Sequence, residues 1–268
     1  MKDLLSPAAW STFRAMLKQQ YLLLTRYPVN MVANFLLVLT MVIVVTLVMT
    51  VFVPRGMQTR LRGITLYGFV IYIFLSHTIW TVGLGLQKEK SEGTLSSLYL
   101  TPASRFLTLL ARSLVALSWT AVAGWLGLFV AQVITGPLLF HSPWLALTIL
   151  LFTISSLIGL GFAIAGFALR FGETIELVAN LLEFGLIGFC AFFFPFSVLP
   201  AAILTITRLI PLSYAVDAFR TVSLGQEPEL LSLNLELVIV ITSGILGPML
   251  GYLIYRVNED KVRQQGVL

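Results

Sequence analysis

The sequence predicts an all-α integral membrane protein with six transmembrane helices, and three observations lead there. Hydrophobic residues make up 58% of the 268 positions and charged residues only 11%, whereas a soluble domain carries about a quarter charged residues. Mean hydropathy is +0.94. Several apolar stretches reach the roughly 20 residues that a helix needs to cross about 30 Å of hydrocarbon. Little chain is left for a separate globular domain.

Residues 1–28 are expected to form an amphipathic helix that lies in the membrane interface. Ser6-Pro7 is typical of an N-cap followed by the first helical position. Apolar side chains then recur at helical spacing, with basic residues elsewhere around the helix, which is typical of an interfacial helix. The apolar positions are Trp10, Phe13, Leu17, Tyr21 and Leu24.

The remainder, residues 29–268, is expected to be a six-span domain. The spans are predicted at about 29–53, 63–86, 106–135, 144–169, 174–194 and 237–255. The short connection after the third span predicts that spans three and four form an antiparallel pair. His77 in the second span is interpreted as a packing residue, because no other metal-ligating side chain lies near it in sequence.

The stretch between the fifth and sixth spans is too short and too broken for a full crossing. Phe196 to Ile210 is apolar, but Pro200 interrupts it and Arg208 and Pro211 close it, so we expect an external re-entrant or interfacial hairpin. Residues 213–236 are expected to form a polar loop.

The basic residues predict the topology. Counted on alternate sides of the six spans, the 17 Lys and Arg residues divide 12 to 5. The positive-inside rule then places both termini in the cytoplasm of a multi-pass protein of the cell (inner or plasma) membrane. Arg55, Arg60 and Arg62 run against the rule. Because the basic residues flank apolar segments, we expect the lipid bilayer, and no nucleic acid, as their partner.

The sequence carries no motif of an enzyme. It has no phosphate-binding loop of the G-x-x-x-x-G-K-[ST] type, no H-E-x-x-H or G-x-S-x-G motif and no Cys/His cluster. Its one cysteine, Cys190, lies in an apolar run and is expected to pack. We therefore predict neither catalytic nor metal-binding residues, so that uphill transport would need a partner ATPase or an ion gradient.

The loop after the second span is the first informative feature. Leu95, Leu98 and Tyr99 form an i, i+3, i+4 stripe that Pro102 ends, which predicts a short cytoplasmic helix. Its apolar stripe suits insertion into a groove on another protein. An ordinary interfacial connector would have the same composition.

This loop resembles the coupling helix of type-2 ATP-binding-cassette exporter permeases. Residues 6–26 resemble the connecting helix of that family, and Pro211 to Arg220, preceded by two prolines, resembles its external hairpin. The positions that the resemblance assigns to ATPase coupling are Glu89, Glu92, Gly93, Thr94, Leu95, Leu98, Tyr99 and Pro102; those assigned to the hairpin are Pro200, Pro211, Tyr214, Asp217 and Arg220.

The resemblance implies how the protein would work. Two permease copies, identical or related and with a homodimer as the expected arrangement, would bind two copies of a separate cytoplasmic ATPase subunit. ATP and Mg would be bound by that partner, with no cofactor in this chain. ATP binding would bring the ATPases together, and the coupling and connecting helices would pass this rigid-body motion to the spans.

The second informative feature is a polar stripe in the fifth span. Glu176, Asn180 and Glu183 are spaced i, i+4 and i+7 on one helical face. A carboxylate near the bilayer centre costs about 2.5–3.5 kcal/mol on insertion scales, so it should face a cavity or a partner. The stripe is a candidate translocation path, with Glu183 a contact for a cationic or polar substrate. Alternatively, Glu183 is protonated or paired with span two or another permease copy, and Glu176 pairs with Arg170.

Two further alternatives stay open. A proton- or ion-coupled secondary transporter would use Glu176 or Glu183 as a relay, but internal repeats typical of that class are not evident. A membrane scaffold without transport would give the carboxylates of the fifth span no role. The Gly247-x-x-x-Gly251 pair, and Gly159, Gly161 and Gly166, are interpreted as packing positions within one chain, with a dimer seam as the alternative.

Overall fold

The computed structural model describes residues 7–26, 28–52, 58–91, 93, 105–136, 140–172 and 174–264. These ranges contain helices and no strand, which confirms the all-α prediction. The α-helices are α1 (Pro7–Arg26), α2 (Pro28–Phe52), α3 (Gln58–His77), α4 (Gly85–Ser91), α6 (Arg105–Thr135), α7 (Pro143–Phe171), α8 (Thr174–Phe189), α9 (Ala201–Thr207), α10 (Pro211–Leu224) and α11 (Leu233–Gln264). A π-helix, η2 (Thr78–Gly83), joins α3 to α4, and a 3₁₀ turn, η3 (Phe196–Val198), follows α8.

Four helical segments of the described chain are long and apolar enough to cross a membrane. They are Arg60–Ser91, Arg105–Ile134, Pro143–Phe171 and Leu233–Gln264. A fifth span results if α9 and α10, which are bent by 97° relative to each other, are counted as one; that bend is typical of a broken span or a re-entrant loop. The described residues thus give four or five spans by length and composition, where six were expected.

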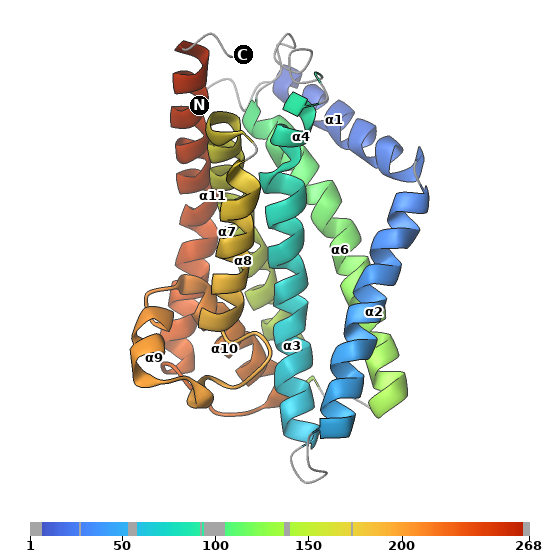
Figure 1. Cartoon of the computed structure of the whole chain (residues 1–268), viewed down its shortest axis with the longest axis vertical. Helices are drawn as coiled ribbons and strands as arrows, with labels where there is room; N and C mark the ends of the chain where they lie inside the picture. Colours follow the sequence, from blue (N-terminus) through green and yellow to red (C-terminus); the bar gives the residue numbers. More distant parts are fainter. Residues whose placement is uncertain are drawn as a thin grey trace.

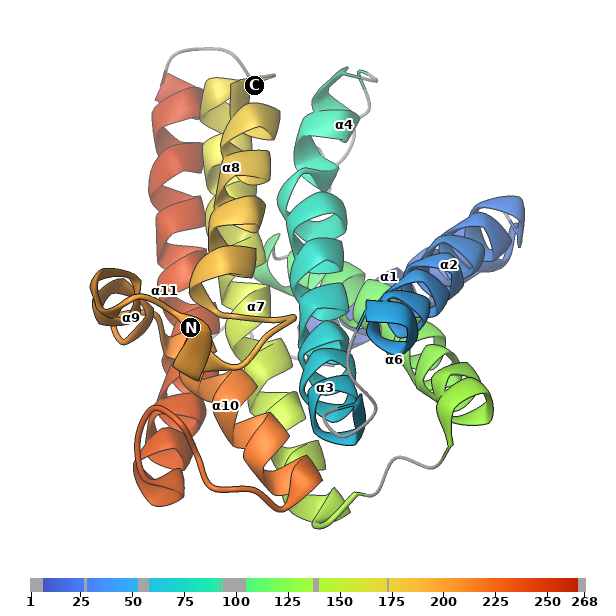
Figure 2. The ribbon, with the colours of Figure 1, turned by 60° about the horizontal axis from the view of Figure 1, so that its bottom comes forward.

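The long helices run alternately up and down one bundle. Figure 1 shows α1 lying across one end of the bundle, the same end that holds α4 and the C-terminal end of α11. At the opposite end lie α9 and α10 (Figure 2), where α10 packs against α7 and α11 and α9 contacts α8. We call these the α1 end and the α10 end.

Glycines allow α7 and α11 to form the most extensive helix pair of the structure. A Cβ built on Gly251 would lie 1.9 Å from the carbonyl oxygen of Gly159, and one on Gly159 would lie 2.1 Å from that of Gly247. The backbones therefore touch where these glycines meet. This confirms that the Gly247/Gly251 pair packs within the chain.

The expected pairing of spans three and four is not the main contact of α7. Only slight packing joins α6 to α7, and α6 packs mainly against α1, α2 and α3. A short loop brings two helices close at one end, but Gly159 and Gly166 of α7 favour the approach of α11. Side-chain packing, which sequence spacing does not reveal, decided the neighbour.

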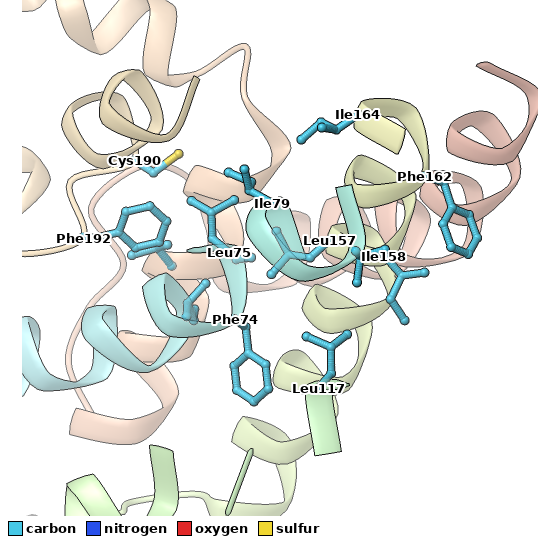
Figure 3. Packing of buried hydrophobic residues seen from close by; sticks show 14 of the residues in the cluster. Phe74, Leu75, Ile79, Leu117, Leu157, Ile158, Phe162, Ile164, Cys190 and Phe192 are labelled. Atoms are coloured by element: carbon cyan, nitrogen blue, oxygen red, sulfur yellow. The ribbon is translucent and has the colours of Figure 1, made fainter. Parts of the chain in front are cut away.

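The α3–η2 helix lies between two apolar clusters. In the larger cluster, Figure 3 shows Leu75 and Ile79 between Phe192 and Cys190 on one side and Leu157 of α7 on the other. The smaller cluster joins α3 to α2 and α6 through Val38, Val42, Leu66, Phe69, Ile73, Ala123 and Ala131. Cys190 is fully buried, in agreement with the expected packing role.

The helix of the predicted fifth span is shorter than expected. α8 ends at Phe189, five residues before the predicted boundary at 194, and its 16 residues are about 24 Å long. The chain continues as turns through Cys190, Ala191 and Phe192, all fully buried. Non-helical backbone at this depth is tolerated where protein covers it.

The predicted polar loop at 213–236 is wrong for its first half. Residues 211–224 form helix α10, and every residue from Ser213 to Ser223 is buried. Asp217 and Arg220 suggested a solvated loop from composition, but both side chains are buried and hydrogen-bonded inside the α10 end. Buried charges of this kind must be paired or hydrogen-bonded, and only the folded chain supplies these partners.

Candidate functional site

The deepest carboxyl group of the polar stripe is held by a tryptophan side chain. Trp80 Nε1 donates a 2.6 Å hydrogen bond to Glu183 Oε2, and Tyr72 lies beside the same carboxyl group. Glu183 is 7% exposed. One part of the alternative prediction for Glu183, a contact with the second span, is therefore observed. The contact is made by Trp80, a neutral partner.

Trp80 reaches Glu183 from the π-helix η2. This single wide turn places an extra residue in the helix, and the Leu84 amide bonds the Ile79 carbonyl five residues back. Such turns are rare and frequently lie at functional sites. η2 packs closely on α7, since a Cβ on Gly161 would lie 2.8 Å from Val82 Cγ1. Hydropathy carries no signal for a π-helix, so the sequence did not reveal it.

The other two residues of the stripe have separate partners. Glu176 is exposed, and its Oε1 accepts a 3.3 Å hydrogen bond from Gln87 Nε2. Asn180 donates to the carbonyl of Glu176 on its own helix. The predicted pairing of Glu176 with Arg170 is not observed, because the Arg170 guanidinium lies 5.3 Å from the centre of the Phe171 ring. The three side chains share a face but form no single cluster.

A cavity of about 390 Å³ opens between α2 and the α3–η2 helix. Its lining includes Trp80, which binds Glu183, together with Tyr72 and His77. His77 has no metal-ligating neighbour: within the described ranges no group of His, Cys, Asp or Glu side chains is placed to hold a metal ion. The cavity was not predicted, since it depends on how far two helices diverge.

Most of the predicted ATPase-coupling residues, namely Glu92, Thr94, Leu95, Leu98, Tyr99 and Pro102, lie outside the described residues. Gly93 is described and has a positive φ of 71°, a backbone conformation that glycine adopts without a steric cost.

Ion pairs hold the chain on both sides of this segment. Before it, Glu89 at the end of α4 pairs with Arg112 of α6. After it, Arg105 at the start of α6 pairs with Glu259 of α11 at 2.6 Å, and Glu259 also lies 3.4 Å from Arg263. Glu259 is only 3% exposed. Arg112 thus joins α6 to α4.

The amphipathic helix α1 packs against the same region. It contacts α6, where the Thr108 hydroxyl donates a 3.1 Å hydrogen bond to Met16 Sδ and Phe13 is buried. Trp10 and Tyr21 remain largely exposed. α1, α4, the start of α6 and the end of α11 thus meet at the α1 end.

At the α10 end, Arg220 holds the turns that follow α8. Its guanidinium donates hydrogen bonds of 2.6–3.2 Å to four main-chain carbonyls, those of Ile64, Ala191, Phe192 and Phe194. It also lies 5.8 Å from the centre of the Phe196 ring. Arginine suits this position because its planar group offers five donors.

Asp217, one turn away, anchors the connection between α10 and α11. Its Oδ2 accepts hydrogen bonds from the amides of Glu229 and Leu230 at 2.8 and 2.7 Å. It also accepts one from the Glu236 carboxyl group, whose Oε1 accepts from the Leu231 amide. A bond between two carboxyl groups requires a shared proton, so the pair carries one negative charge.

The remaining predicted hairpin residues define its corners. Pro200 precedes α9 and Pro211 is the first residue of α10, where a missing amide proton is harmless. The Tyr214 hydroxyl donates a 2.7 Å hydrogen bond to the carbonyl of Arg208. Glu236 is the residue of this region that the sequence did not indicate, because its partner lies 19 positions away on another helix.

Long apolar helices, a bent helix pair and buried charges satisfied within the bundle define a multi-pass α-helical membrane protein. The chain belongs to the ABC-2 type transporter family, whose model matches residues 11–224. Membrane domains of this family are permease subunits without ATPase activity of their own, and they generally pair with ATPase subunits. The predicted resemblance is thereby confirmed. No curated protein matches this chain.

Proposed function

We propose that this chain is the membrane subunit of an ATP-driven exporter that works as a homodimer with two copies of a cytoplasmic ATPase subunit. ATP and Mg bind the ATPase. The family match supports ATP coupling over an ion gradient as the energy source. The full proposal has six spans, with α2 and α8 as the first and fifth and both termini in the cytoplasm.

The ATPase contact of the proposal is the segment from Glu89 to Pro102. Two ion pairs, Glu89–Arg112 and Arg105–Glu259, hold the chain on the two sides of this segment and support the proposal. A push on the segment would reach α6 and α11 through these pairs, and α6 also packs on α1. Rigid helices that share such contacts move as units.

The translocation path of the proposal follows the face of α8 that carries Glu176, Asn180 and Glu183. Glu183 supports it, as a carboxylate that the fold keeps buried among neutral hydrogen-bond donors. The hairpin from Pro200 to Arg220 would close the outer end of the path, because its buried polar residues fix α10 against α11.

A copurification experiment tests the ATPase contact. The tagged chain is expressed with the ATPase subunit encoded beside it, and vanadate-sensitive ATP hydrolysis is measured in the purified complex. We expect Leu95→Asp to abolish both assembly and hydrolysis, and Glu92→Ala to reduce hydrolysis. Leu209→Asp is the control, since Leu209 is 79% exposed at the α10 end.

If assembly and hydrolysis survive Leu95→Asp, the coupling assignment is wrong. If no ATPase subunit assembles with the wild-type chain, and transport follows a proton gradient, the alternative of a secondary transporter with Glu176 or Glu183 as a relay is favoured.

A further inference from the structure

The cavity between α2 and the α3–η2 helix has the size of a small-molecule site. Its volume of about 390 Å³ lies within the range of roughly 300–1,000 Å³ of ligand pockets. Figure 1 shows α2 and α3 close together at the α10 end and apart toward the α1 end; the lining residues come from these two segments. They are Leu37, Val38 and Met41 of α2 and Tyr72, Ile73, Ser76, His77, Trp80 and Thr81 of α3–η2.

The two walls differ in chemistry. The described α2 residues of the lining are all apolar, whereas the opposite wall carries two large aromatic rings, the His77 imidazole and three hydroxyl groups. Among the described residues of the lining there is no lysine, arginine, aspartate or glutamate. The Trp80 side is accessible, because this residue is 41% exposed.

The Glu183 carboxyl group lies directly behind the aromatic wall. Glu183, which is not part of the lining, accepts a hydrogen bond from the ring N–H of Trp80 and lies beside Tyr72. The ion pairs of the described residues involve Arg105, Arg112 and Arg263, and none of them reaches Glu183. Among the described residues, no ion pair places a cation beside this carboxyl group.

An ionised Glu183 affects what the two rings can bind. A ring whose N–H donates a hydrogen bond to a carboxylate gains electron density. The negative face of an aromatic ring attracts cations, and tryptophan attracts them most strongly. Low dielectric surroundings strengthen both effects. An anion would instead meet the ring faces and the Glu183 charge, with no donor of positive charge in the lining.

We propose that this cavity binds an amphiphilic organic cation, with its charged centre on the faces of Trp80 and Tyr72 and its apolar part on Leu37, Val38 and Met41. Glu183 acts through the rings as a charge behind the site. The inference rests on the proposed function only in making the bound molecule a transported substrate. The binding itself is a property of this chain.

Two hydrophobic ions of equal shape and opposite charge test the proposal. The full chain in lipid nanodiscs is titrated with tetraphenylphosphonium and, separately, with tetraphenylborate, and partition into empty nanodiscs is subtracted. We expect saturable binding of tetraphenylphosphonium alone. Glu183→Gln keeps a hydrogen-bonding group but removes the charge, and should weaken that binding about tenfold. Glu227→Gln removes an exposed charge at the α10 end and should change binding less than about twofold.

A second variant leaves the carboxylate and its bonds intact. Met41→Trp fills the cavity from the α2 wall and should abolish binding, whereas Met249→Trp places the same ring on an exposed position of α11 and should not. Equal binding of both ions, wild-type affinity in Glu183→Gln, or wild-type affinity in Met41→Trp would overturn the proposal. No ATPase is present, so loss of cation binding and loss of ATPase assembly are separate failures.

Discussion

The Arg220 guanidinium donates a 2.6 Å hydrogen bond to the main-chain carbonyl of Phe192, and so connects α10 to the turns that end α8. Its other donors reach three more carbonyls. The helix of the fifth span can stop early because one buried side chain replaces the hydrogen bonds that further helical turns would have supplied.

Replacement of Arg220 should destabilise the protein. Arg220→Ala leaves four carbonyls without these donors, and an unsatisfied buried group costs about 1–3 kcal/mol, so we expect a loss of at least about 3 kcal/mol. Arg220→Lys should be intermediate, since lysine has three donors. Thermal unfolding in detergent measures both, with exposed Arg208→Ala as the control. Equal stability of Arg220→Ala and wild type would contradict the role of these bonds.

Substitution of Gly251 should separate α7 from α11. The Cβ of Gly251→Ala meets the Gly159 carbonyl oxygen at 1.9 Å, so the backbones must move apart, and overpacking of this kind costs about 1–3 kcal/mol. Gly188→Ala is the matched control, because a Cβ there meets no atom within 4 Å. It should leave stability unchanged or raise it by up to about 1 kcal/mol. Unfolding in a graded detergent series measures the stability of both variants. Equal stability of the two would show that α7 and α11 are not tightly packed at Gly251.

The carboxyl pair of Asp217 and Glu236 should tolerate a neutral Glu236 but not its removal. Glu236→Gln keeps a donor toward Asp217, and we expect a change within about 1 kcal/mol. Glu236→Ala leaves Asp217 and the Leu231 amide without that partner, at a cost of about 1–3 kcal/mol. The free energy of unfolding of each is compared with that of exposed Glu227→Gln. A larger loss in the Gln variant than in the Ala variant would show that the pair does not share a proton.

Exchange of charges should test the route from the ATPase contact to α6. Glu89→Arg and Arg112→Glu each place like charges together, and we expect each to reduce ATP hydrolysis by the assembled complex. The double exchange restores an ion pair and should recover most of the activity, because coupled residues give non-additive effects. Both side chains are partly exposed, so folding should survive. Purely additive losses would exclude this pair as a transmission contact.

Labelling of single cysteines should test the proposed topology. Cys190 is fully buried and should not react with a membrane-impermeant maleimide in intact cells. Glu227→Cys at the α10 end should react, and Lys261→Cys at the α1 end should react only after permeabilisation. The reverse pattern would place both termini outside.

The sequence by itself determined the class of this protein and most of its helix positions. Apolar length and charge distribution act locally, so α7 at Pro143–Phe171 and α6 at Arg105–Thr135 lie close to the predicted spans. The family followed from short motifs in order along the chain. Glycine spacing also indicated close packing, since small residues leave a local signature.

Only the tertiary structure decided which distant residues meet. Trp80 binds Glu183 from a π-helix, and Arg220 satisfies carbonyls at positions 64 and 191–194. The polar residues of α10 have the composition of a loop, yet they lie in a buried helix. Whether a charged group is buried depends on hydrogen-bonding partners from other segments of the chain. A hydropathy average includes only neighbours in sequence, so it cannot detect such partners. The cavity beside Trp80 likewise arises from the angle between two helices, which side-chain packing sets.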